Sequence, residues 1–472
     1  MKEKISFFLS RQLLSIVLLI IFFIVSSLND ALWLSSIDEV LFVTGVFILI
    51  YIILIKVIPL FNRNLAGMEI LAFLLLFIIL LLPKLHSNIY EVSNGKIKLS
   101  YLLGLFGFLF LIVIYQLNFK PKTSFTKLKN YIITVLALFI LIEICIIPSI
   151  FKDRNLLKTE ILNFEKNKFD AQFKLTKKPN IYHIIFDAYT GFDGLDRYWQ
   201  FRDTSFLNYL RTEKISFAYN AKTCNDNTLE SITSLFNLKS FNNETKFRSL
   251  ATKSHVYRKL IQKALVIETL MENGYTISNL SIFDIHDKKR YWDFPWLDPN
   301  ISFPQYCFNQ SLIGNLYKNY QSRNIANNNL LIISDLKQKV QVKKTSPLFT
   351  YAHLIMPHTP NNFDKDGNYI GNISNDKDAY IGELQYCNKI MIELIEMVKK
   401  DDPSAILILQ SDHGSGMIPS NYDMEVSNIL SLVVAPDSLQ LEWPDSMINQ
   451  NTYKHVFNAL GQYAIPITSC QD

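Results

Sequence analysis

The first 150 residues alternate between long apolar segments and short polar connections. Each apolar segment approaches the ~20 residues that a helix needs to cross the hydrocarbon core of a bilayer. Five such segments lie at about 12–28, 40–61, 68–83, 100–117 and 131–150. The pattern predicts a five-helix transmembrane domain over residues 1–150. The first segment has no small-residue cleavage site that we recognise, so we interpret it as a retained helix rather than a signal peptide.

Lys and Arg residues in the connections predict how these helices are oriented, because positive charge is retained on the cytoplasmic side. One side carries nine of them, namely Lys2, Lys4, Arg11, Lys56, Arg63, Lys120, Lys122, Lys127 and Lys129. The other side carries three, namely Lys84, Lys96 and Lys98. We therefore expect a cytoplasmic amino terminus. With an odd number of spans, the carboxyl-terminal part is expected outside.

From Pro179 onward, short apolar runs alternate with segments of helical periodicity. Strands are predicted at 181–186, 275–280, 347–354, 405–410 and 427–435, and helices at 200–213, 228–238, 256–273, 325–342, 376–400 and 451–462. This alternation is typical of an α/β fold with a mostly parallel sheet covered by helices on both faces. Residues 151–178 mix charged and apolar positions. They predict an amphipathic linker, which either lies on the membrane surface or forms a solvated helix.

Charge follows the same division of the chain. Of the 47 basic and 42 acidic residues, 12 and 7 lie in residues 1–150, which leaves 35 of each sign beyond it. A neutral soluble part gives no electrostatic reason to expect nucleic-acid binding. Cys145 lies in an apolar segment. The other four cysteines, Cys224, Cys307, Cys387 and Cys470, could form two disulfides outside the cytoplasm, in a pairing that the sequence does not determine.

Polar side chains stand at the carboxyl ends of three predicted strands. Asp187 ends the first, His353 and His358 lie at the end of another, and Asp412 and His413 follow the apolar run 405–410. Open α/β sheets place their ligand sites at this edge. Two carboxylates, an imidazole and a hydroxyl suit a borderline divalent cation. A Thr- and Ser-rich helix start at 228–237 would supply the hydroxyl and backbone N–H groups that bind phosphate or sulfate.

Four stretches in this order make the chain recognisable: 179–187, 228–237, 353–360 and 410–414. The chain resembles the alkaline phosphatase/sulfatase superfamily, within it the membrane-bound branch of phosphoethanolamine transferases and lipoteichoic acid synthases. It is also similar to uncharacterised sulfatase-like membrane proteins that share the His-x-x-x-Pro-His-x-Pro loop. The resemblance implies a multi-span helical membrane domain, followed by an extracytoplasmic sulfatase-like catalytic α/β domain over residues 179–472.

The resemblance also implies a metal site. Asp187, Thr228, Asp412 and His413 fall on positions that hold one divalent metal, Zn²⁺ or Mn²⁺ in preference to Ca²⁺ or Mg²⁺. The transferases have Glu where this chain has Asp187. Thr228 falls on the catalytic nucleophile, counted back from residues 234–237, and the alternatives Thr223 and Ser231 stay open.

Substrate contacts are implied for three more residues. His358 falls on the histidine that contacts substrate phosphate, and His353 and Asn227 are grouped with it as substrate-binding residues. The inward strand position of His353 favours a buried supporting histidine over a direct metal ligand.

The implied function is metal-dependent transfer of a phosphoethanolamine- or phosphoglycerol-like head group. The donor would be a membrane lipid and the acceptor an envelope glycan or lipid, with a phospho-threonine intermediate. The protein would be a monomer in the inner (plasma) membrane of a bacterium, with its catalytic domain periplasmic or extracellular.

Two departures from the family pattern leave alternatives open. Cys224 is not followed by the Pro or Ala and then Arg of a formylglycine motif, and residues 415–454 contain no histidine, whereas the transferases have a second one there. A sulfatase-family hydrolase of sulfate esters or phosphodiesters is one alternative. The other is a degenerate sulfatase-fold protein that binds or assembles envelope components.

Overall fold

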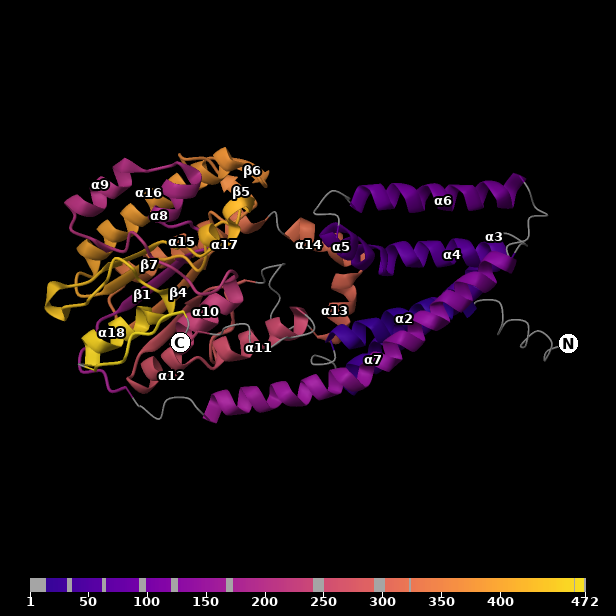
Figure 1. Cartoon of the computed structure of the whole chain (residues 1–472), viewed down its shortest axis with the longest axis horizontal. Coiled ribbons are helices and arrows are strands. Elements are labelled where there is room, and N and C mark those ends of the chain that lie inside the picture. The colour runs from indigo at the N-terminus through magenta and orange to yellow at the C-terminus, as the bar shows by residue number, and fades with distance from the viewer. Residues whose placement is uncertain are drawn as a thin grey trace. The chain divides into compact units, whose positions relative to one another are not determined.

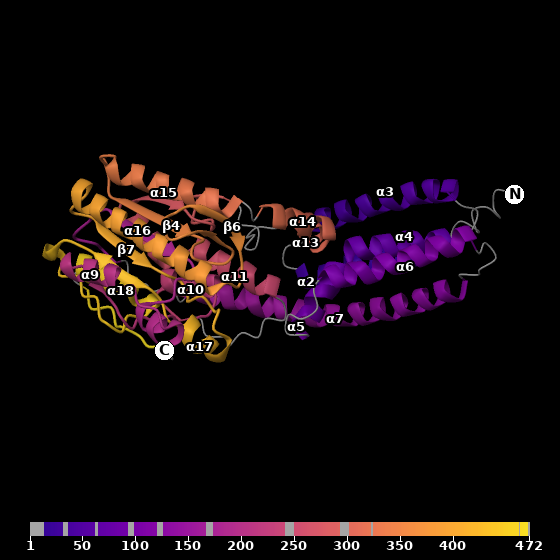
Figure 2. The ribbon, with the colours of Figure 1, turned by 90° about the horizontal axis from the view of Figure 1, so that it is seen from above.

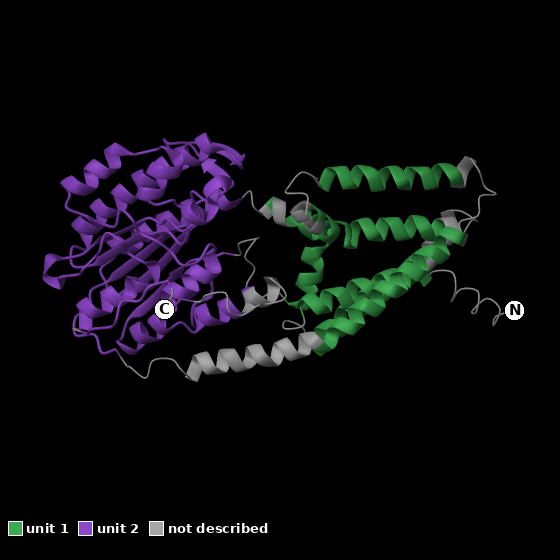
Figure 3. Cartoon of the chain, viewed as in Figure 1, with its two compact units in different colours: residues 1–160, 249–252, 300–320 green, residues 161–248, 253–299, 321–472 purple. Residues whose placement is uncertain are grey.

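The chain forms two compact units (Figure 3). The computed structural model describes residues 14–31, 36–61, 65–92, 99–119, 126–166, 173–240, 250–292, 302–321, 324–461 and 463–470. Unit 1 comprises residues 1–160, 249–252 and 300–320, and unit 2 comprises the remainder. The predicted domain limit at residue 150 falls inside one continuous helix, Thr126–Lys166. Residues 167–172 and the side chains of 151–172 lie outside the described part, so the amphipathic linker stays a prediction.

Unit 1 is built mainly from the amino-terminal helices. These are α2 (Leu14–Ala31), α3 (Ile37–Phe61), α4 (Leu65–Leu80), α5 (Leu82–Val92), α6 (Leu99–Phe119) and α7 (Thr126–Lys166). Four stretches are long and apolar enough to cross a membrane: Leu14–Ala31, Ile37–Leu54, Leu99–Gln116 and Lys127–Pro148. The third predicted segment forms a shorter apolar helix, Met68–Leu80. The chain is a multi-pass membrane protein.

The shorter helix nevertheless accompanies α2 along its length. At one end the Ser15 hydroxyl donates to the Glu69 carboxylate at 2.7 Å. At the other end Lys84, in α5, lies 2.5 Å from Asp30. Ser15 and Asp30 are as many residues apart in α2 as Glu69 and Lys84 are along α4 and α5. In a helix this separation corresponds to a rise of about 22 Å. The segment from Glu69 to Lys84 therefore runs parallel to α2, which supports the expected serial crossing.

Helix α7 runs in the same direction beside α2. Lys129, near its start, lies 2.6 Å from the buried carboxylate of Glu69. Further along α7, Glu143 accepts a hydrogen bond from the Asn29 side chain at 2.5 Å. Charged groups among apolar helices are costly unless they are paired. These pairs fix α2, α4 and α7 in one parallel register, and the chain leaves α7 at the end where Asn29 lies.

Unit 2 is an α/β domain around a six-stranded sheet of order β2-β8-β7-β1-β4-β3. Its strands are β1 (Ile181–Phe186), β2 (Ser216–Phe217), β3 (Thr276–Leu280), β4 (Leu348–Leu354), β7 (Ile406–Gln410) and β8 (Ser431–Val434). β7, β1, β4 and β3 are mutually parallel, and β8 is antiparallel to β7. A separate hairpin pairs β5 (Asn361–Phe363) with β6 (Tyr369–Ile373). The mostly parallel sheet is as predicted.

Helices cover both faces of this sheet (Figures 1 and 2). They are α8 (Phe192–Gly194), α9 (Thr204–Thr212), α10 (Thr228–Asn237), α11 (Leu250–Gln262), α12 (Leu265–Glu272), α15 (Ile325–Gln341), α16 (Lys377–Asp401), α17 (Tyr422–Val426) and α18 (Thr452–Gly461). α15 and α16 lie side by side on one face and pack against Tyr182, Ile184 and Phe186 of β1. On the other face, Tyr453 of α18 donates to or accepts from His183 at 2.7 Å.

Two expectations about the helices after Pro179 differ from the structure. The helix predicted at 256–273 is two helices, α11 and α12, because Ala264 takes an extended backbone conformation. The break lets the Asn237 side chain accept a hydrogen bond from Leu265 N, which caps the start of α12. The second difference is α13 (Phe303–Gln310) and α14 (Leu312–Gln321), which were not predicted and belong largely to unit 1.

One disulfide links Cys224 to Cys470, which are 246 residues apart in the sequence. The cysteine count allowed two disulfides, but among the described residues Cys307 and Cys387 are buried free thiols. Disulfides persist in oxidising compartments. The bond encloses most of unit 2 in one loop, and long loops give the largest entropic stabilisation.

We predict that Cys470→Ser lowers the free energy of unfolding by about 2–5 kcal/mol, because the unfolded chain regains the freedom that the bond removes. Chemical denaturation of the full-length protein in detergent would measure this loss, and a reductant should reproduce it in the unsubstituted protein. Cys145→Ser, which removes an exposed thiol outside the bond, is the matched control. Equal stability of the Cys470→Ser and Cys145→Ser variants would contradict the prediction.

Candidate active site

Strand register brings two carboxylates to the same level at the carboxyl edge of the sheet. Ile185 of β1 is paired with Gln410 of β7 on one side and with His353 of β4 on the other. Asp187 and Asp412 each lie two residues beyond a paired position. Parallel strands end at the same edge, so adjacent strands in this register deliver both side chains to one place. Both carboxylates are almost completely buried.

Each carboxylate leaves one oxygen unsatisfied. Asp412 Oδ1 accepts hydrogen bonds from the backbone N–H groups of Ala188, at 3.1 Å, and His413, at 2.9 Å. Asp412 Oδ2 and Asp187 Oδ1 are buried and have no hydrogen-bond partner among the described residues. Ala188 adopts a positive φ of 60°, which is uncommon for a residue with a side chain and is typical of functional sites.

His413 turns its free ring nitrogen toward these oxygens. Its Nδ1 lies 2.7 Å from the Gly414 carbonyl oxygen, which can only accept, so Nδ1 carries the proton. Nε2 therefore has a free lone pair in the neutral ring. It lies 3.4 Å from Asp412 Oδ2 and 3.7 Å from Asp187 Oδ1. Burial lowers the pKa of His413, but the charges of Asp412 and Asp187, with the Gly414 carbonyl and Asp226, together raise it above its usual value.

His353 contacts Asp187 directly. Its Nε2 lies 3.2 Å from Asp187 Oδ2, and its Nδ1 lies 3.0 Å from the Tyr351 hydroxyl. Burial raises the pKa of Tyr351 far above its usual value, so this hydroxyl stays protonated and can donate to Nδ1. Nε2–H of His353 then donates to Asp187. This arrangement suits the predicted supporting histidine, although ligand atoms of Asp187, His353 and Asp412 all lie within 4.8 Å of one another.

The chemistry of this donor set fits a divalent cation. Two buried carboxylates this close repel each other unless positive charge or protons intervene. The unsatisfied oxygens of Asp187 and Asp412, together with His413 Nε2, are the oxygen and nitrogen donors that borderline divalent metals take. Burial acts to raise the pKa of Asp187, but the charge of His358, the hydrogen bond and charge of His353 and the charge of His413 together lower it to about 2. Asp187 is therefore a carboxylate near neutral pH.

The Thr228 hydroxyl faces the same cluster. Thr228 is the first residue of α10, and its Oγ1 lies 3.2 Å from His413 Nε2. The competing hydroxyls have other contacts: Ser231 donates to the Asp412 backbone carbonyl at 2.6 Å, and Thr223 lies 3.3 Å from Ser231. Of the three candidates, Thr228 is the one whose hydroxyl contacts His413.

Asn227 caps the helix that Thr228 begins. Its Oδ1 accepts a hydrogen bond from Glu230 N at 3.1 Å, and its amide donates to Asp226 at 3.0 Å. An N-cap of this kind fixes the first turn and aligns its backbone N–H groups. The predicted contact between Asn227 and the substrate stays a prediction.

A loop after β4 holds His358, which is partly buried and whose Nδ1 lies 2.6 Å from the Thr359 carbonyl oxygen. Glu383 of α16 anchors this loop by accepting from the Asn361 side chain, at 2.8 Å, and from Asn362 N, at 3.0 Å. Burial raises the pKa of Glu383 to about 7, against the effect of these hydrogen bonds. Glu383 could not be singled out from the sequence, because helix α16 carries several other acidic residues.

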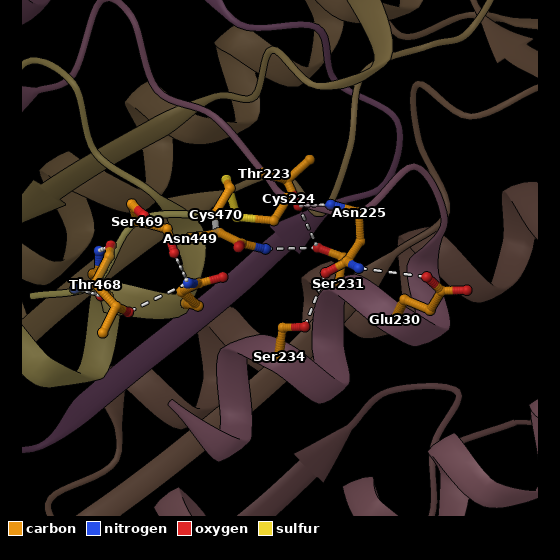
Figure 4. The surroundings of a disulfide bond; sticks show 12 residues. Thr223, Cys224, Asn225, Glu230, Ser231, Ser234, Asn449, Thr468, Ser469 and Cys470 are labelled. Atoms are coloured by element: carbon orange, nitrogen blue, oxygen red, sulfur yellow. Dashed lines mark hydrogen bonds between the residues drawn. A yellow bond between two sulfur atoms is a disulfide. The ribbon is translucent and has the colours of Figure 1, made fainter. Parts of the chain in front are cut away.

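The disulfide lies at the entrance to α10 (Figure 4). Cys224 is four residues before Thr228, and next to it Asn225 accepts a hydrogen bond from Ser234 at 2.8 Å. On the other side, Asn449 donates to Ser231 at 2.6 Å. The carboxyl-terminal tail thus holds the loop that leads into the candidate nucleophile.

The family model described as Sulfatase matches residues 183–466, which is more than half of the chain. The chain belongs to the sulfatase family. A comparison with curated proteins gave no match.

Similar solved structures include lipooligosaccharide phosphoethanolamine transferase A of Neisseria meningitidis. The full-length membrane protein shares 12% identity over 96% of this chain and 95% of its own, with a TM-score of 0.44. Its soluble domain shares 13% identity over 61% and 89%, with a TM-score of 0.41. A protein of glycosaminoglycan metabolism from Bacteroides thetaiotaomicron shares 14% identity over 61% and 74%, with a TM-score of 0.39. The family assignment rests on the domain match.

The chain is an enzyme of the sulfatase/alkaline phosphatase superfamily, whose members use metal. Its buried residues Asp187, His353 and Asp412 form a group that could hold a metal ion.

The loop after Gly414 is where the chain departs from the expected pattern. Buried Glu425 accepts from Ser415 N at 3.2 Å, from Gly416 N at 2.7 Å and from Trp199 Nε1 at 3.1 Å. Residue 414 must be glycine, because a Cβ there would overlap the Glu425 carbonyl group. Sequence reasoning missed Glu425, since its loop shows no periodicity.

We predict that Asp412→Asn abolishes stoichiometric binding of a divalent metal by the purified full-length protein. The substitution keeps the size of the side chain but removes the negative charge that offsets the cost of burying a cation. Elemental mass spectrometry after dialysis against trace Zn²⁺ or Mn²⁺ would measure it.

Asp402→Asn is the matched control, because Asp402 is also a buried carboxylate, which accepts from Tyr182 at 2.8 Å and from Asn180 at 2.8 Å, before β7 begins. It should retain the metal. Loss of metal from both variants, or from neither, would contradict the assignment.

Proposed function

We propose that this protein transfers a phospho-head group, of the phosphoethanolamine or phosphoglycerol kind, from a membrane lipid to an envelope glycan or lipid. The observation that carries the proposal is the position of the Thr228 hydroxyl. It lies at the start of α10, 3.2 Å from His413 Nε2, beside two buried carboxylates that each have an unsatisfied oxygen. A hydroxyl nucleophile, a cation site and a helix amino terminus in one place are what phosphoryl transfer requires.

Asp187, Asp412, His413 and Thr228 would hold one divalent cation, for which we propose Zn²⁺ or Mn²⁺. The bound cation would lower the pKa of the Thr228 hydroxyl and neutralise negative charge on the phosphate. His353 orients Asp187 through the hydrogen bond between them. The amino-terminal turn of α10, fixed by its Asn227 cap, directs backbone N–H groups and the positive end of the helix dipole toward a phosphate.

The reaction would proceed in two displacements at phosphorus. In the first, Thr228 Oγ1 forms a bond to phosphorus as the bond to the diacylglycerol oxygen breaks. The Thr228 proton leaves the site and the diacylglycerol oxygen gains a proton, for which His358 is the proposed donor. In the second, an acceptor hydroxyl bonds to phosphorus as the bond to Thr228 Oγ1 breaks, and the acceptor's proton goes to Thr228 Oγ1. The proton that Thr228 lost in the first displacement replaces the one that His358 gave. The sum is transfer of the head group with Thr228 restored.

The disulfide favours phosphoryl chemistry over sulfate-ester hydrolysis by a formylglycine. Cys224 lies beside the nucleophile position, and its sulfur is bonded to Cys470. It is therefore not available for conversion to an aldehyde. The disulfide also supports an oxidising location for unit 2. Together with the distribution of basic residues, it supports the proposed orientation, with the amino terminus cytoplasmic and unit 2 outside the inner membrane of a bacterium. A monomer is the proposed state.

We predict that Thr228→Val reduces head-group release from phosphatidylethanolamine or phosphatidylglycerol in mixed micelles on the order of 10³-fold or more. The valine keeps the shape of threonine but has no oxygen to attack phosphorus. Diacylglycerol formed by the metal-loaded full-length protein would be measured. Appearance of the head group on an added glycan, rather than in water, would distinguish transfer from hydrolysis.

Thr223→Val is the matched control, because it makes the same chemical change at the competing hydroxyl and should keep most of the activity. Full activity of Thr228→Val would rule out the proposed nucleophile. No turnover of either lipid by the metal-loaded protein would favour the binding or assembly role instead.

A further inference from the structure

A segment that follows strand β3 in sequence packs with the membrane helices. Residues 300–320, which contain α13 and most of α14, belong to unit 1. Phe303 N donates to Glu39 of α3 at 3.3 Å, and the Tyr306 hydroxyl donates to Asp30 of α2 at 3.2 Å. The side chains of Phe303, Tyr306 and Cys307 are buried in one apolar cluster with residues of α2 and α3. α13 therefore packs against α2 and α3 at the end of unit 1 where Asp30 lies.

A tight turn at Ser311 joins α13 to α14. Ser311 N donates to the Phe308 carbonyl at 2.9 Å, and the Ser311 hydroxyl donates to the same carbonyl at 2.6 Å. That hydroxyl also accepts from Gly314 N at 3.1 Å. A Cβ at Gly314 would overlap the Phe308 carbonyl group, so the close approach of the two helices requires glycine. The direction of α14 is thus fixed by α13.

α14 carries an exposed apolar face. Ile313, Leu316, Tyr317 and Tyr320 are 56%, 60%, 51% and 62% exposed. Their spacing of three and four residues places them along one side of a helix. Gly314, on another side, is buried against α13. Four large apolar side chains on so short a helix form a surface that proteins in water seldom leave uncovered.

We infer that this face of α14 lies in the lipid head-group region of the leaflet at that end of unit 1. The apolar membrane helices fix the level of α13, and α13 fixes α14. At the same end, the first turns of α3 expose Ile37, Leu41 and Phe42, at 78%, 63% and 63%. These side chains belong to a candidate membrane span and face outward from it. Tyrosines among aliphatic side chains are typical of helices that lie in the interface.

The test uses tryptophan fluorescence of the full-length protein in vesicles of phosphatidylethanolamine and phosphatidylglycerol. Tyr320→Trp places a new indole on the apolar face of α14 with little change in size. We expect loss of the added fluorescence when the lipids carry bromine near the head group, and less loss when bromine is near the chain ends. Tyr369→Trp, at an equally exposed tyrosine of β6 in unit 2, is the control and should show no added quenching.

Equal quenching of the two variants, or none for Tyr320→Trp, would overturn the inference. The readout needs no catalysis, so the two proposals can fail separately. Quenching at Tyr320→Trp without lipid turnover would leave the interfacial helix standing and reject the proposed function. Turnover without quenching would do the reverse.

Discussion

The active site depends on the proximity of two buried carboxylates. Asp187 and Asp412 reach the same edge of the sheet because β1 pairs in register with β7. Each keeps one buried oxygen without a hydrogen-bond partner among the described residues. Such a pair is unstable in a protein interior unless positive charge balances it. The protonated Nδ1 of His413, the positive φ of Ala188 and the placement of α10 are all consistent with a cation between these groups.

The sequence predicted the parts of this site that follow from strand endings. Asp187, Asp412 and His413 end apolar runs, so their convergence could be expected from parallel topology, whereas the position of Thr228 was implied by the family resemblance. The contact between His353 and Asp187 could not, because it depends on the lateral register of β4 against β1. Glu425 was not anticipated, since it lies in an irregular loop. Cysteine pairing likewise depends on tertiary folding, which brings Cys470 beside Cys224.

In the membrane unit, the apolar pattern of the sequence determines which segments are helices, and the polar pairs determine how these helices are arranged. Five apolar segments were expected and all form helices, although the third is shorter than the rest. Ser15 with Glu69, and Asp30 with Lys84, show that this shorter segment still runs beside α2. The return of α13 and α14 to this unit was not predictable, because their sequence, rich in Asn and aromatic residues, resembles a loop of the soluble part. The proposed site for lipid head groups and the proposed interfacial helix thus occur in one chain.

The central claim is that Thr228 is the nucleophile of a metal-dependent site. It is tested most directly by acid-quenching the metal-loaded full-length protein during reaction with phosphatidylethanolamine or phosphatidylglycerol and sequencing its peptides by mass spectrometry. The account predicts a phospho-head group on Thr228, absent when Asp412 is replaced by Asn. An adduct on Thr223, Ser231 or a histidine, or an adduct on Thr228 that forms without metal, would contradict it.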